Sequence, residues 1–286
     1  MSIAFKLNCR GKIIDLNSHT HLMGVINCTP DSFYAGSRNF DAKSAIELGI
    51  RMAEEGADIL DIGGESTRPG AESVSEQEEL NRIVPVISAL LSVVDVPLSI
   101  DTYKAKVAQE ALELGAHMLN DISALTFDPG MAAIVSEFNV PVILMHIKGK
   151  PKDMQKHPYY DDVIDEIFNY FEQRIQYALK CGIKFEQIIL DPGIGFGKRL
   201  VDNYDIIKNL SIFKKLERPI LVGISRKSFI GKVLNLPPEE SMEGSIAAST
   251  AAILNGANIL RVHDVKEMKR AAKITDTLTG KSLLCN

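Results

Sequence analysis

The sequence predicts an α/β protein folded as a single (β/α)8 TIM barrel, and three observations support this fold class. Eight short runs rich in Val, Ile and Leu stop abruptly at a polar residue or a glycine, as buried parallel strands do. Helical patterns separate these runs, and no change in composition divides the 286 residues, so residues 1–286 are expected to form one domain. An open, doubly wound sheet is the alternative, but it more often has about five or six strands.

The predicted strands are, in chain order, Met23–Asn27, Asp58–Gly63, Pro97–Asp101, His117–Asp121, Pro141–His146, Gln187–Asp191, Pro219–Ser225 and Asn258–His263. Before them, Phe5–Leu16 alternates around Cys9-Arg10-Gly11-Lys12, a pattern typical of a β-hairpin. This hairpin, within residues 1–20, is expected to plug the floor of the barrel formed by residues 21–286.

Helical patterns between the strands cover Ala42–Glu55, Ser75–Val93, Lys104–Leu114, Met131–Phe138, Tyr160–Cys181, Tyr204–Leu210 and Glu243–Asn255. A glycine at the end of a helix favours a left-handed cap, because glycine adopts that backbone conformation without a steric penalty. Several of the predicted helices end in this way, at Gly56, Gly115, Gly182 and Gly256.

The composition indicates which partners to expect. A formal net charge of −5 and a pI near 5.7 leave no basic footprint for nucleic acid. No apolar run approaches the length of about 18 residues that a membrane helix needs, so a soluble cytoplasmic protein without a membrane anchor is expected. The four cysteines contain no C-x-x-C pair, which favours reduced thiols over a disulfide framework or a thiolate zinc site.

Polar side chains close nearly every predicted strand. In barrels of this kind the loops at the carboxyl ends of the strands form the functional mouth. One Asp or Asn at such a position is often only a helix cap or a turn residue, but a whole series is not explained in that way. Because the series mixes carboxylates with cations, it predicts a ligand that has both a hydrogen-bonding heterocycle and an anionic group. Its members are Asn27, Asp61 with Glu65–Arg68, Asp101, Asn120 with Asp121, His146 with Lys148, Asp191, Ser225–Ser228, and Arg261 with His263.

The glycine-rich segment after Asp191 has the wrong spacing for a dinucleotide-binding loop and follows the sixth strand rather than the first. Its glycines are expected to let the backbone turn tightly, so that Asp191 and Phe196 face a planar ligand. The loop Ser225–Ser228 begins a helix, where free backbone N–H groups favour an anion. Lys227 in this loop is a candidate for imine chemistry, but hydrogen bonding is favoured because no apolar surroundings isolate it.

His19 and His21 form an H-x-H pair, an arrangement that ligates zinc in some hydrolases at the end of the first barrel strand. Here the pair precedes the first predicted strand and should therefore lie at the barrel floor. The mouth offers no further set of histidines, so a turn is favoured over a catalytic zinc site.

The ordered motifs from Met23 to Val265 resemble those of dihydropteroate synthases. The matching stretches are MGVINCTPDSF from Met23, DIGGESTRPG from Asp61, SIDT from Ser99, NDI from Asn120, MH from Met145, DPGIGFGK from Asp191, SRKSF from Ser225 and RVHD from Arg261. The chain departs from the usual family pattern at Cys28, Tyr34, Ala35 and Ile147. None of these departures removes an expected ligand, although Tyr34 and Ala35 alter the expected 4-aminobenzoate subsite.

The resemblance implies that a pterin diphosphate is joined to 4-aminobenzoate, with Mg²⁺ as the cofactor, in a homodimer. It assigns catalytic roles to Asp101, Lys227, Arg261 and Asn27. The pterin would bind to Asp101, Asn120, Met145, Asp191, Phe196 and Lys227. The diphosphate would bind to Asn27, which also contacts Mg²⁺, and to Thr67, Arg68, Arg261 and His263. The 4-aminobenzoate would bind to Phe33, Thr67, Arg68, Pro69, Lys227 and Ser228.

By the same resemblance, the diphosphate leaves before the amine attacks, so no protein nucleophile is required. The loops Thr29–Arg38 and Gly64–Ser73 are expected to close over bound substrate. A pterin-dependent corrinoid methyltransferase and a non-catalytic pterin-binding module are the alternatives. Both would have less use for the residues assigned to the diphosphate.

Overall fold

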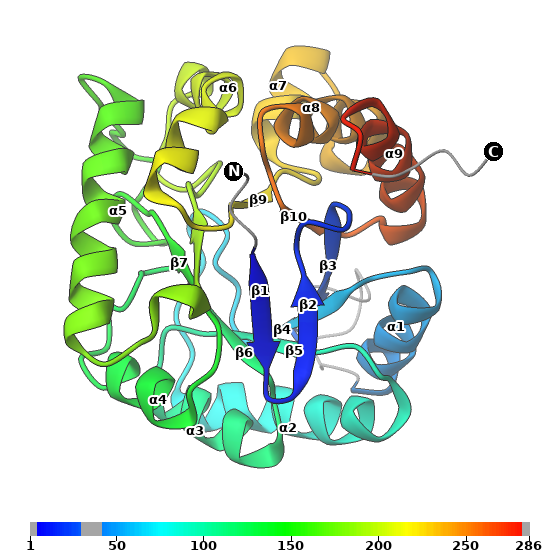
Figure 1. Ribbon diagram of the computed structural model, residues 1–286, viewed down its shortest axis with the longest axis vertical. Helices are drawn as coiled ribbons and strands as arrows, with labels where there is room; N and C mark the ends of the chain where they lie inside the picture. The colour runs from blue at the N-terminus through cyan, green and yellow to red at the C-terminus, as the bar shows by residue number, and fades with distance from the viewer. Residues whose placement is uncertain (1–4, 30–41, 282–286) are drawn as a thin grey trace.

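The computed structural model describes residues 5–29 and 42–281. Eight parallel strands form one sheet in the order β8-β7-β6-β5-β4-β3-β10-β9, and a parallel bridge between Leu190 and Ile220 joins its two edges. The sheet therefore closes into the predicted TIM barrel, with the helices outside it (Figure 1). Its strands are β3 (His21–Asn27), β4 (Ile59–Gly63), β5 (Leu98–Asp101), β6 (Met118–Asp121), β7 (Val142–Met145), β8 (Ile188–Asp191), β9 (Leu221–Gly223) and β10 (Ile259–Val262).

The helices are α1 (Ala42–Glu54), α2 (Glu76–Val93), α3 (Ala105–Leu114), α4 (Met131–Phe138), α5 (Val163–Lys180), α6 (Leu200–Lys208), α7 (Ser228–Leu234), α8 (Met242–Leu254) and α9 (Val265–Leu278). Short 3-10 turns lie at η1 (Phe185–Gln187), η2 (Leu210–Leu216) and η3 (Pro238–Glu240). The prediction was wrong at the start of α5, where the Asp162 carboxylate caps the first turn by accepting from the N–H groups of Ile164 and Asp165. It also placed the start of α6 too late and left out α9.

The glycines that were expected to cap helices do so. Gly56, Gly115, Gly182 and Gly256 have φ angles of 99°, 120°, 89° and 108°. A side chain in this region of backbone space would clash with its own carbonyl group, so glycine is favoured there. These helix ends were therefore readable from the sequence.

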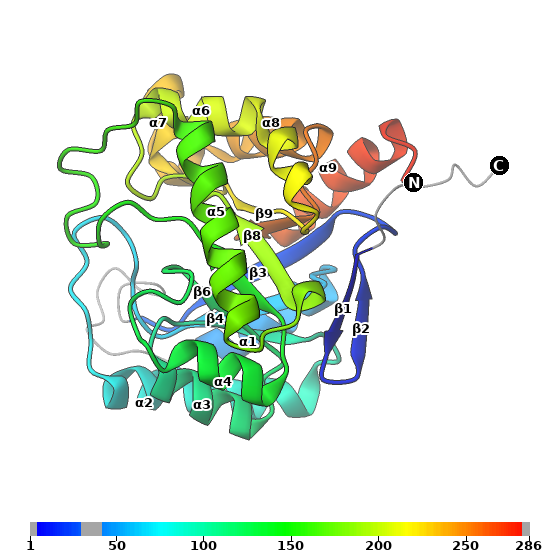
Figure 2. The ribbon, with the colours of Figure 1, turned by 60° about the vertical axis from the view of Figure 1, so that its left-hand side comes forward.

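The N-terminal hairpin pairs β1 (Lys6–Cys9) with β2 (Lys12–Asp15) and covers one end of the barrel (Figure 2). Its buried side chains pack inside the barrel against apolar residues near the starts of the strands, which confirms the predicted floor plug. This cluster consists of Leu7, Cys9, Ile14, Leu16, Met23, Ile59, Met118, Ile143, Ile189, Leu221 and Ile259. The opposite end of the barrel is left for polar side chains.

Among the helices in the described part of the chain, none combines the length and the apolar character needed to cross a bilayer. Cys9, Cys28 and Cys181 are free thiols, and the first two are buried. Burial raises the pKa of both buried thiols to about 12, so they are protonated and unreactive at neutral pH.

Candidate active site

Arg261 connects two carboxylates at the carboxyl end of the barrel. From β10, its Nε donates to Asp61 Oδ2 of β4 at 2.6 Å, and its Nη2 donates to Asp101 Oδ2 of β5 at 2.7 Å. Asn120 Nδ2 of β6 donates to the same oxygen of Asp61 at 2.9 Å, while Asp61 Oδ1 is buried without a hydrogen-bond partner. Side chains from four strands thus form one network.

The network places charge in a largely dry environment. Burial raises the pKa of Asp101 to about 7, against the opposing effect of the Arg261 guanidinium, and the nearby Asp61 carboxylate adds to the rise. For Arg261, burial acts to lower the pKa, but the carboxylates of Asp61 and Asp101 outweigh it and raise the pKa. The guanidinium therefore stays charged, and the protonation of Asp101 responds to what binds beside it.

Asp191 and Lys227 form the second half of the mouth. Asp191, at the end of β8, accepts from the Gly193 N–H at 2.8 Å. Lys227 donates to the Ile194 carbonyl, and its Nζ lies 4.7 Å from the centre of the Phe196 ring. Burial raises the pKa of Asp191, whereas burial lowers the pKa of Lys227 to about 8; each group's charge offsets part of the shift in the other.

Gly223 brings the two halves together. A β-carbon built at this glycine of β9 would lie 3.6 Å from Lys227 Nζ and 3.8 Å from Arg261 Cβ, so both side chains pass over the same stretch of backbone. Asp101, Asp191, Lys227 and Arg261 therefore meet at one rim. This convergence is what a ligand with a heterocycle and an anionic group requires.

The glycine-rich segment after Asp191 turns as predicted. Gly193, Gly195 and Gly197 have φ angles of 67°, 86° and 62°. A β-carbon at Gly193 would lie 1.9 Å from the His146 carbonyl oxygen, and one at Gly197 would lie 2.2 Å from that of Lys148. These contacts allow no side chain, so the glycines are there for close backbone approach.

The other predicted residues lie around the same rim. Asn27 ends β3 and is half-buried, and Met145 ends β7 and is buried. His263 follows β10, with its Nδ1 3.2 Å from Ser225 Oγ. Burial, reinforced by the positive charges of Arg261, Arg226 and Arg68, lowers the pKa of His263 to about 4.

The more peripheral predicted residues are less enclosed. Thr67 is half-buried, whereas the side chains of Arg68, Pro69 and Ser228 are exposed. Phe33 and most of the loop Thr29–Arg38 lie outside the described residues. The structure thus brings together the residues that were predicted to bind the pterin, whereas the expected 4-aminobenzoate subsite is only partly covered by the described residues.

Three polar residues at strand ends serve the surrounding structure instead. Asp121 accepts from the N–H groups of Ser123 and Leu125, so it stabilises a turn. Lys148 pairs with Glu166 at 2.8 Å on the surface. The Nδ1 atom of the His146 ring lies 3.0 Å from the buried Lys198 Nζ.

An ion network that the sequence did not predict holds the loop after β4. Glu65 accepts from Tyr103 Oη and from Lys104 Nζ, both at 2.6 Å. Lys104 Nζ also donates to Glu79 of α2 at 2.6 Å. A usable signal did exist, because Glu79 occupies the buried face of an amphipathic helix, where an acid needs a partner.

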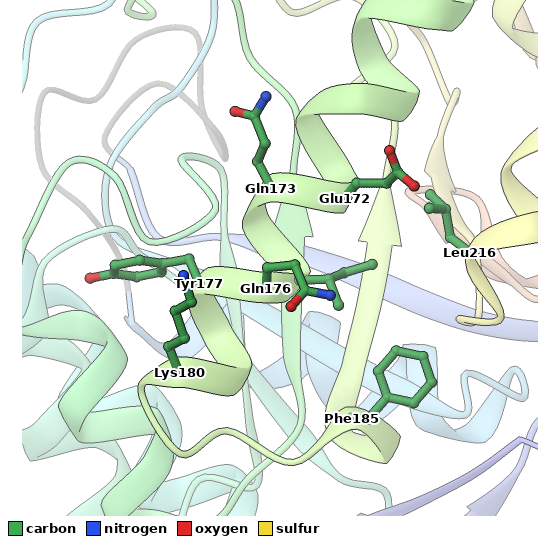
Figure 3. A pocket seen from close by; sticks show the side chains of 8 residues that line it. Glu172, Gln173, Gln176, Tyr177, Lys180, Phe185 and Leu216 are labelled. Carbon is green, nitrogen blue, oxygen red and sulfur yellow. The ribbon is translucent and has the colours of Figure 1, made fainter.

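A groove elsewhere on the molecule has no part in this site. It has a volume of about 630 Å³ and lies outside the barrel, against α5 (Figure 3). Its walls come from Glu172, Gln173, Ile175, Gln176, Tyr177, Lys180, Phe185 and Leu216. None of these residues belongs to the mouth.

Comparison with known proteins agrees with this geometry. Residues 23–263 match the family described as "Pterin binding enzyme". A dihydropteroate synthase of Escherichia coli K12 is 45% identical over 277 residues, which cover 96% of this chain and 98% of the relative. A dihydropteroate synthase of a Synechocystis species is 47% identical over 267 residues, covering 93% and 92% of the two chains.

Solved structures superpose over nearly the whole chain. The Yersinia pestis dihydropteroate synthase with a sulfonamide drug gives a TM-score of 0.92 at 46% identity, covering 96% of this chain and all of that one. The Xanthomonas albilineans dihydropteroate synthase with 4-aminobenzoic acid gives 0.91 at 42%, covering 96% and 98%. That enzyme in complex with 7,8-dihydropteroate gives 0.87 at 39%, with the same coverage.

The fold and the mouth are those of a pterin-binding barrel enzyme. Within that class, the matches extend over almost the full length of both chains, at identities well above 30%. The chain belongs to the dihydropteroate synthase family.

Proposed function

We propose that the chain catalyses the dihydropteroate synthase reaction. In this reaction 7,8-dihydropterin-6-ylmethyl diphosphate and 4-aminobenzoate give 7,8-dihydropteroate and pyrophosphate, a transfer that supplies folate biosynthesis. The convergence of Asp101, Asp191, Lys227 and Arg261 at one rim carries the proposal. Relatives that bind 4-aminobenzoic acid and 7,8-dihydropteroate support it.

The pterin ring is assigned to the buried polar groups of the mouth. Its N–H edges suit the carboxylates of Asp101 and Asp191 as acceptors, and the Asn120 amide and the Lys227 ammonium complete the polar contacts. Met145 and Phe196 would pack on the ring. Because the barrel already holds these side chains in place, they would orient the pterin ring before the reaction starts.

The diphosphate is assigned to Thr67, Arg68, Arg261 and His263, with Asn27 as the contact to Mg²⁺. The mouth fits such an ion in a limited way: Asn27 offers one amide oxygen, and among the described residues no three His, Cys, Asp or Glu side chains converge there. That donor set suits Mg²⁺ held mainly by substrate oxygens and water. When bound, the ion would neutralise negative charge on the leaving group.

The 4-aminobenzoate is assigned to the outer part of the rim. Thr67, Arg68 and Pro69 come from the loop after β4. Lys227 ends the loop after β9, and Ser228 is the first residue of α7. Phe33 would complete this subsite. The side chains of Arg68 and Ser228 are exposed, so a second substrate can reach them from solvent.

The chemistry follows from the charges around the methylene carbon. The C–O bond to the diphosphate breaks and its electrons leave with pyrophosphate, while Arg261 offsets the growing negative charge. Asp101 stabilises the positive charge left on the pterin. The amine nitrogen of 4-aminobenzoate then bonds to the methylene carbon and releases a proton, so the chain supplies no nucleophile.

We also propose that the chain forms a homodimer through the surface of α6, α7 and α8. These helices adjoin one another at the edge of the barrel (Figure 1). They expose large apolar side chains, which is typical of a surface covered by a partner. The exposed residues are Leu200, Val201, Tyr204, Val233, Leu234 and Leu254.

We propose that the chain forms a single domain. We also propose that it is located in the cytoplasm, because free thiols are typical of a reducing compartment.

One assay tests the activity. The purified protein is mixed with Mg²⁺, the pterin diphosphate and 4-aminobenzoate, and both pyrophosphate and dihydropteroate are measured. We expect the two products in equal amounts and only when 4-aminobenzoate is present. Pyrophosphate release without 4-aminobenzoate would show that the chain only hydrolyses the pterin diphosphate. That outcome, or no release at all, would contradict the proposal.

A further inference from the structure

His19 and His21 lie next to Asp58 at the floor of the barrel, remote from the mouth. His21 is the first residue of β3 and Asn27 is its last, so about 20 Å of strand separates the group from the rim. Asp58 immediately precedes β4, the neighbour of β3. One potential ligand atom from each of the three residues lies within 4.8 Å of the other two.

We propose that His19, His21 and Asp58 form a binding site for a divalent transition-metal ion of the Zn²⁺ class. Two imidazole nitrogens and one carboxylate oxygen are a common protein ligand set for zinc, which leaves a fourth position for water. This site is distinct from the oxygen-rich mouth and takes no part in pteroate synthesis.

The backbone holds the two imidazoles in place. The two rings are stacked, with centroids 4.0 Å apart and 20° between their planes. Thr20, between them, is fixed to Asp276 of α9 by two hydrogen bonds, from its N–H at 2.7 Å and from its Oγ1 at 2.6 Å. The backbone between the rings is therefore held in place before an ion binds. Because the nitrogen lone pairs of the stacked rings lie in nearly parallel planes, one ring must turn about its side-chain bonds before both nitrogens can bind one ion.

The hydrogen bonds of the Nδ1 atoms leave both Nε2 atoms able to ligate. His21 Nδ1 lies 3.1 Å from the His19 carbonyl oxygen, which can only accept, so the ring proton is on Nδ1. His19 Nδ1 lies 2.9 Å from Ser18 Oγ, which donates to the Asp15 carbonyl at 2.7 Å and so is free to accept from the ring. Metal-bound histidines usually have such an outer partner for the second nitrogen.

The carboxylate also has one oxygen available. Asp58 Oδ2 accepts from the Leu22 N–H at 2.8 Å and from Lys269 Nζ at 3.0 Å. Asp58 Oδ1 lies 3.0 Å from His19 Nε2 and 3.2 Å from Lys269 Nζ. A metal ion would replace the proton between His19 and Oδ1, while Lys269 could remain on Oδ2.

Two features limit the affinity. Tetrahedral zinc ligands at about 2.0–2.1 Å from the ion lie about 3.4 Å apart, so the group must contract and one of the stacked rings must turn. The side chain of His19 is 38% exposed and that of Asp58 is 20% exposed, so this side can move and admits the ion. The ammonium of Lys269 opposes a nearby cation, and removing it should therefore tighten binding.

The test uses the full-length, untagged protein after removal of bound metal. Isothermal titration with Zn²⁺ should give one site per chain that is lost or weakened on the order of 10- to 100-fold in His19→Ala and in Asp58→Asn, since even outer-shell losses cost that much. Lys269→Met should bind more tightly than wild type. His157→Ala, which removes an exposed histidine elsewhere, should bind like wild type.

Two further readouts separate this site from the mouth. A crystal soaked in Zn²⁺ should show anomalous scattering between the two imidazoles. Pteroate synthesis by His19→Ala should remain within about twofold of wild type, whatever the outcome for the proposed activity. Zinc that binds His19→Ala and Asp58→Asn as tightly as wild type, or anomalous density elsewhere only, would overturn the proposal, and so would an absence of binding at micromolar Zn²⁺.

Discussion

The floor and the mouth of the barrel are lined from the same strands but hold opposite kinds of side chain. At the floor, alternate positions such as Ile59 pack on the hairpin in a dry apolar cluster. Two residues later, on the same face of β4, Asp61 receives hydrogen bonds from Arg261 and Asn120. The same strand therefore stabilises the fold with apolar side chains at its start and positions charged side chains of the site at its end.

The largest expected effect is at the mouth, from Arg261→Ala. This change leaves Asp61 and Asp101 buried without their cation, so we expect about a 100-fold loss of kcat/KM, or about 2.7 kcal/mol on the barrier. The free energy of unfolding should fall by about 3 kcal/mol because an uncompensated charge remains. Pyrophosphate release and urea unfolding measure the two effects. Arg270→Ala, at an exposed arginine on α9, is the control and should match wild type.

The floor should show the reverse pattern in Leu7→Ala. Leu7 is 1% exposed within the plug, so its truncation should lower the free energy of unfolding by about 3 kcal/mol. The kcat/KM of the folded fraction should stay within about twofold of wild type. Ile13→Ala is the matched control, because Ile13 lies on the same hairpin and is 60% exposed. A specific loss of activity in folded Leu7→Ala would break the division between floor and mouth.

At the mouth, Asp101→Asn is a smaller change that keeps the shape of the side chain. We expect turnover to fall at least about tenfold, or about 1.4 kcal/mol, because the amide cannot offset positive charge on the pterin. Steady-state kinetics with both substrates checks this, and Asp95→Asn, at a surface carboxylate, serves as the control. Wild-type turnover in Asp101→Asn would remove this residue from the mechanism.

The smallest expected effect is the response of the mouth to pH. Burial raises the pKa of Asp101 to about 7, so the folded protein keeps a proton that the unfolded chain releases near pH 4. The resulting stability is complete below about pH 4 and is lost as the pH rises through about 7. Urea unfolding at pH 5 and pH 8 should therefore show a larger loss of stability in wild type than in Asp101→Asn.

The kinetic counterpart has the opposite sign. Ionised Asp101 is the form that stabilises the pterin cation, so kcat/KM should rise with pH on the acid side, with an apparent pKa above the usual aspartate range. An apparent pKa near the ordinary aspartate value of about 3.9 in this pH profile would contradict the prediction. It would show that the charge of Arg261 has a larger effect on the pKa of Asp101 than burial has.

Much of the barrel could be predicted because its signals are local. Buried parallel strands are short apolar runs, and glycines such as Gly115 and Gly182 mark helix ends through their backbone conformation. Boundaries were missed where a side chain intervened, as when Asp162 caps α5 and delays its start. The start of α6 was misplaced for a similar reason. The Asp202 carboxylate accepts from the Arg199 N–H at 2.7 Å, so the helix begins earlier than the sequence pattern predicted.

The mouth was only partly predictable. Polar residues at strand ends identified Asp101, Asp191 and Arg261, but they identified Asp121 and Lys148 as well, which serve a turn and a surface ion pair. The strand end gives a position along the barrel axis and does not give the direction of the side chain. For this reason the sequence could not separate ligands of the mouth from residues that support its loops.

By itself, the sequence determined the number and order of the strands, the hairpin plug and the end of the barrel where polar groups gather. Only the tertiary structure decided that Arg261 reaches Asp61 across a sequence separation of 200 residues and that His19 and His21 meet Asp58. The reason is that periodicity and turn chemistry act between near neighbours along the chain. Closure of the sheet decides which side chains from distant segments share one low-dielectric space.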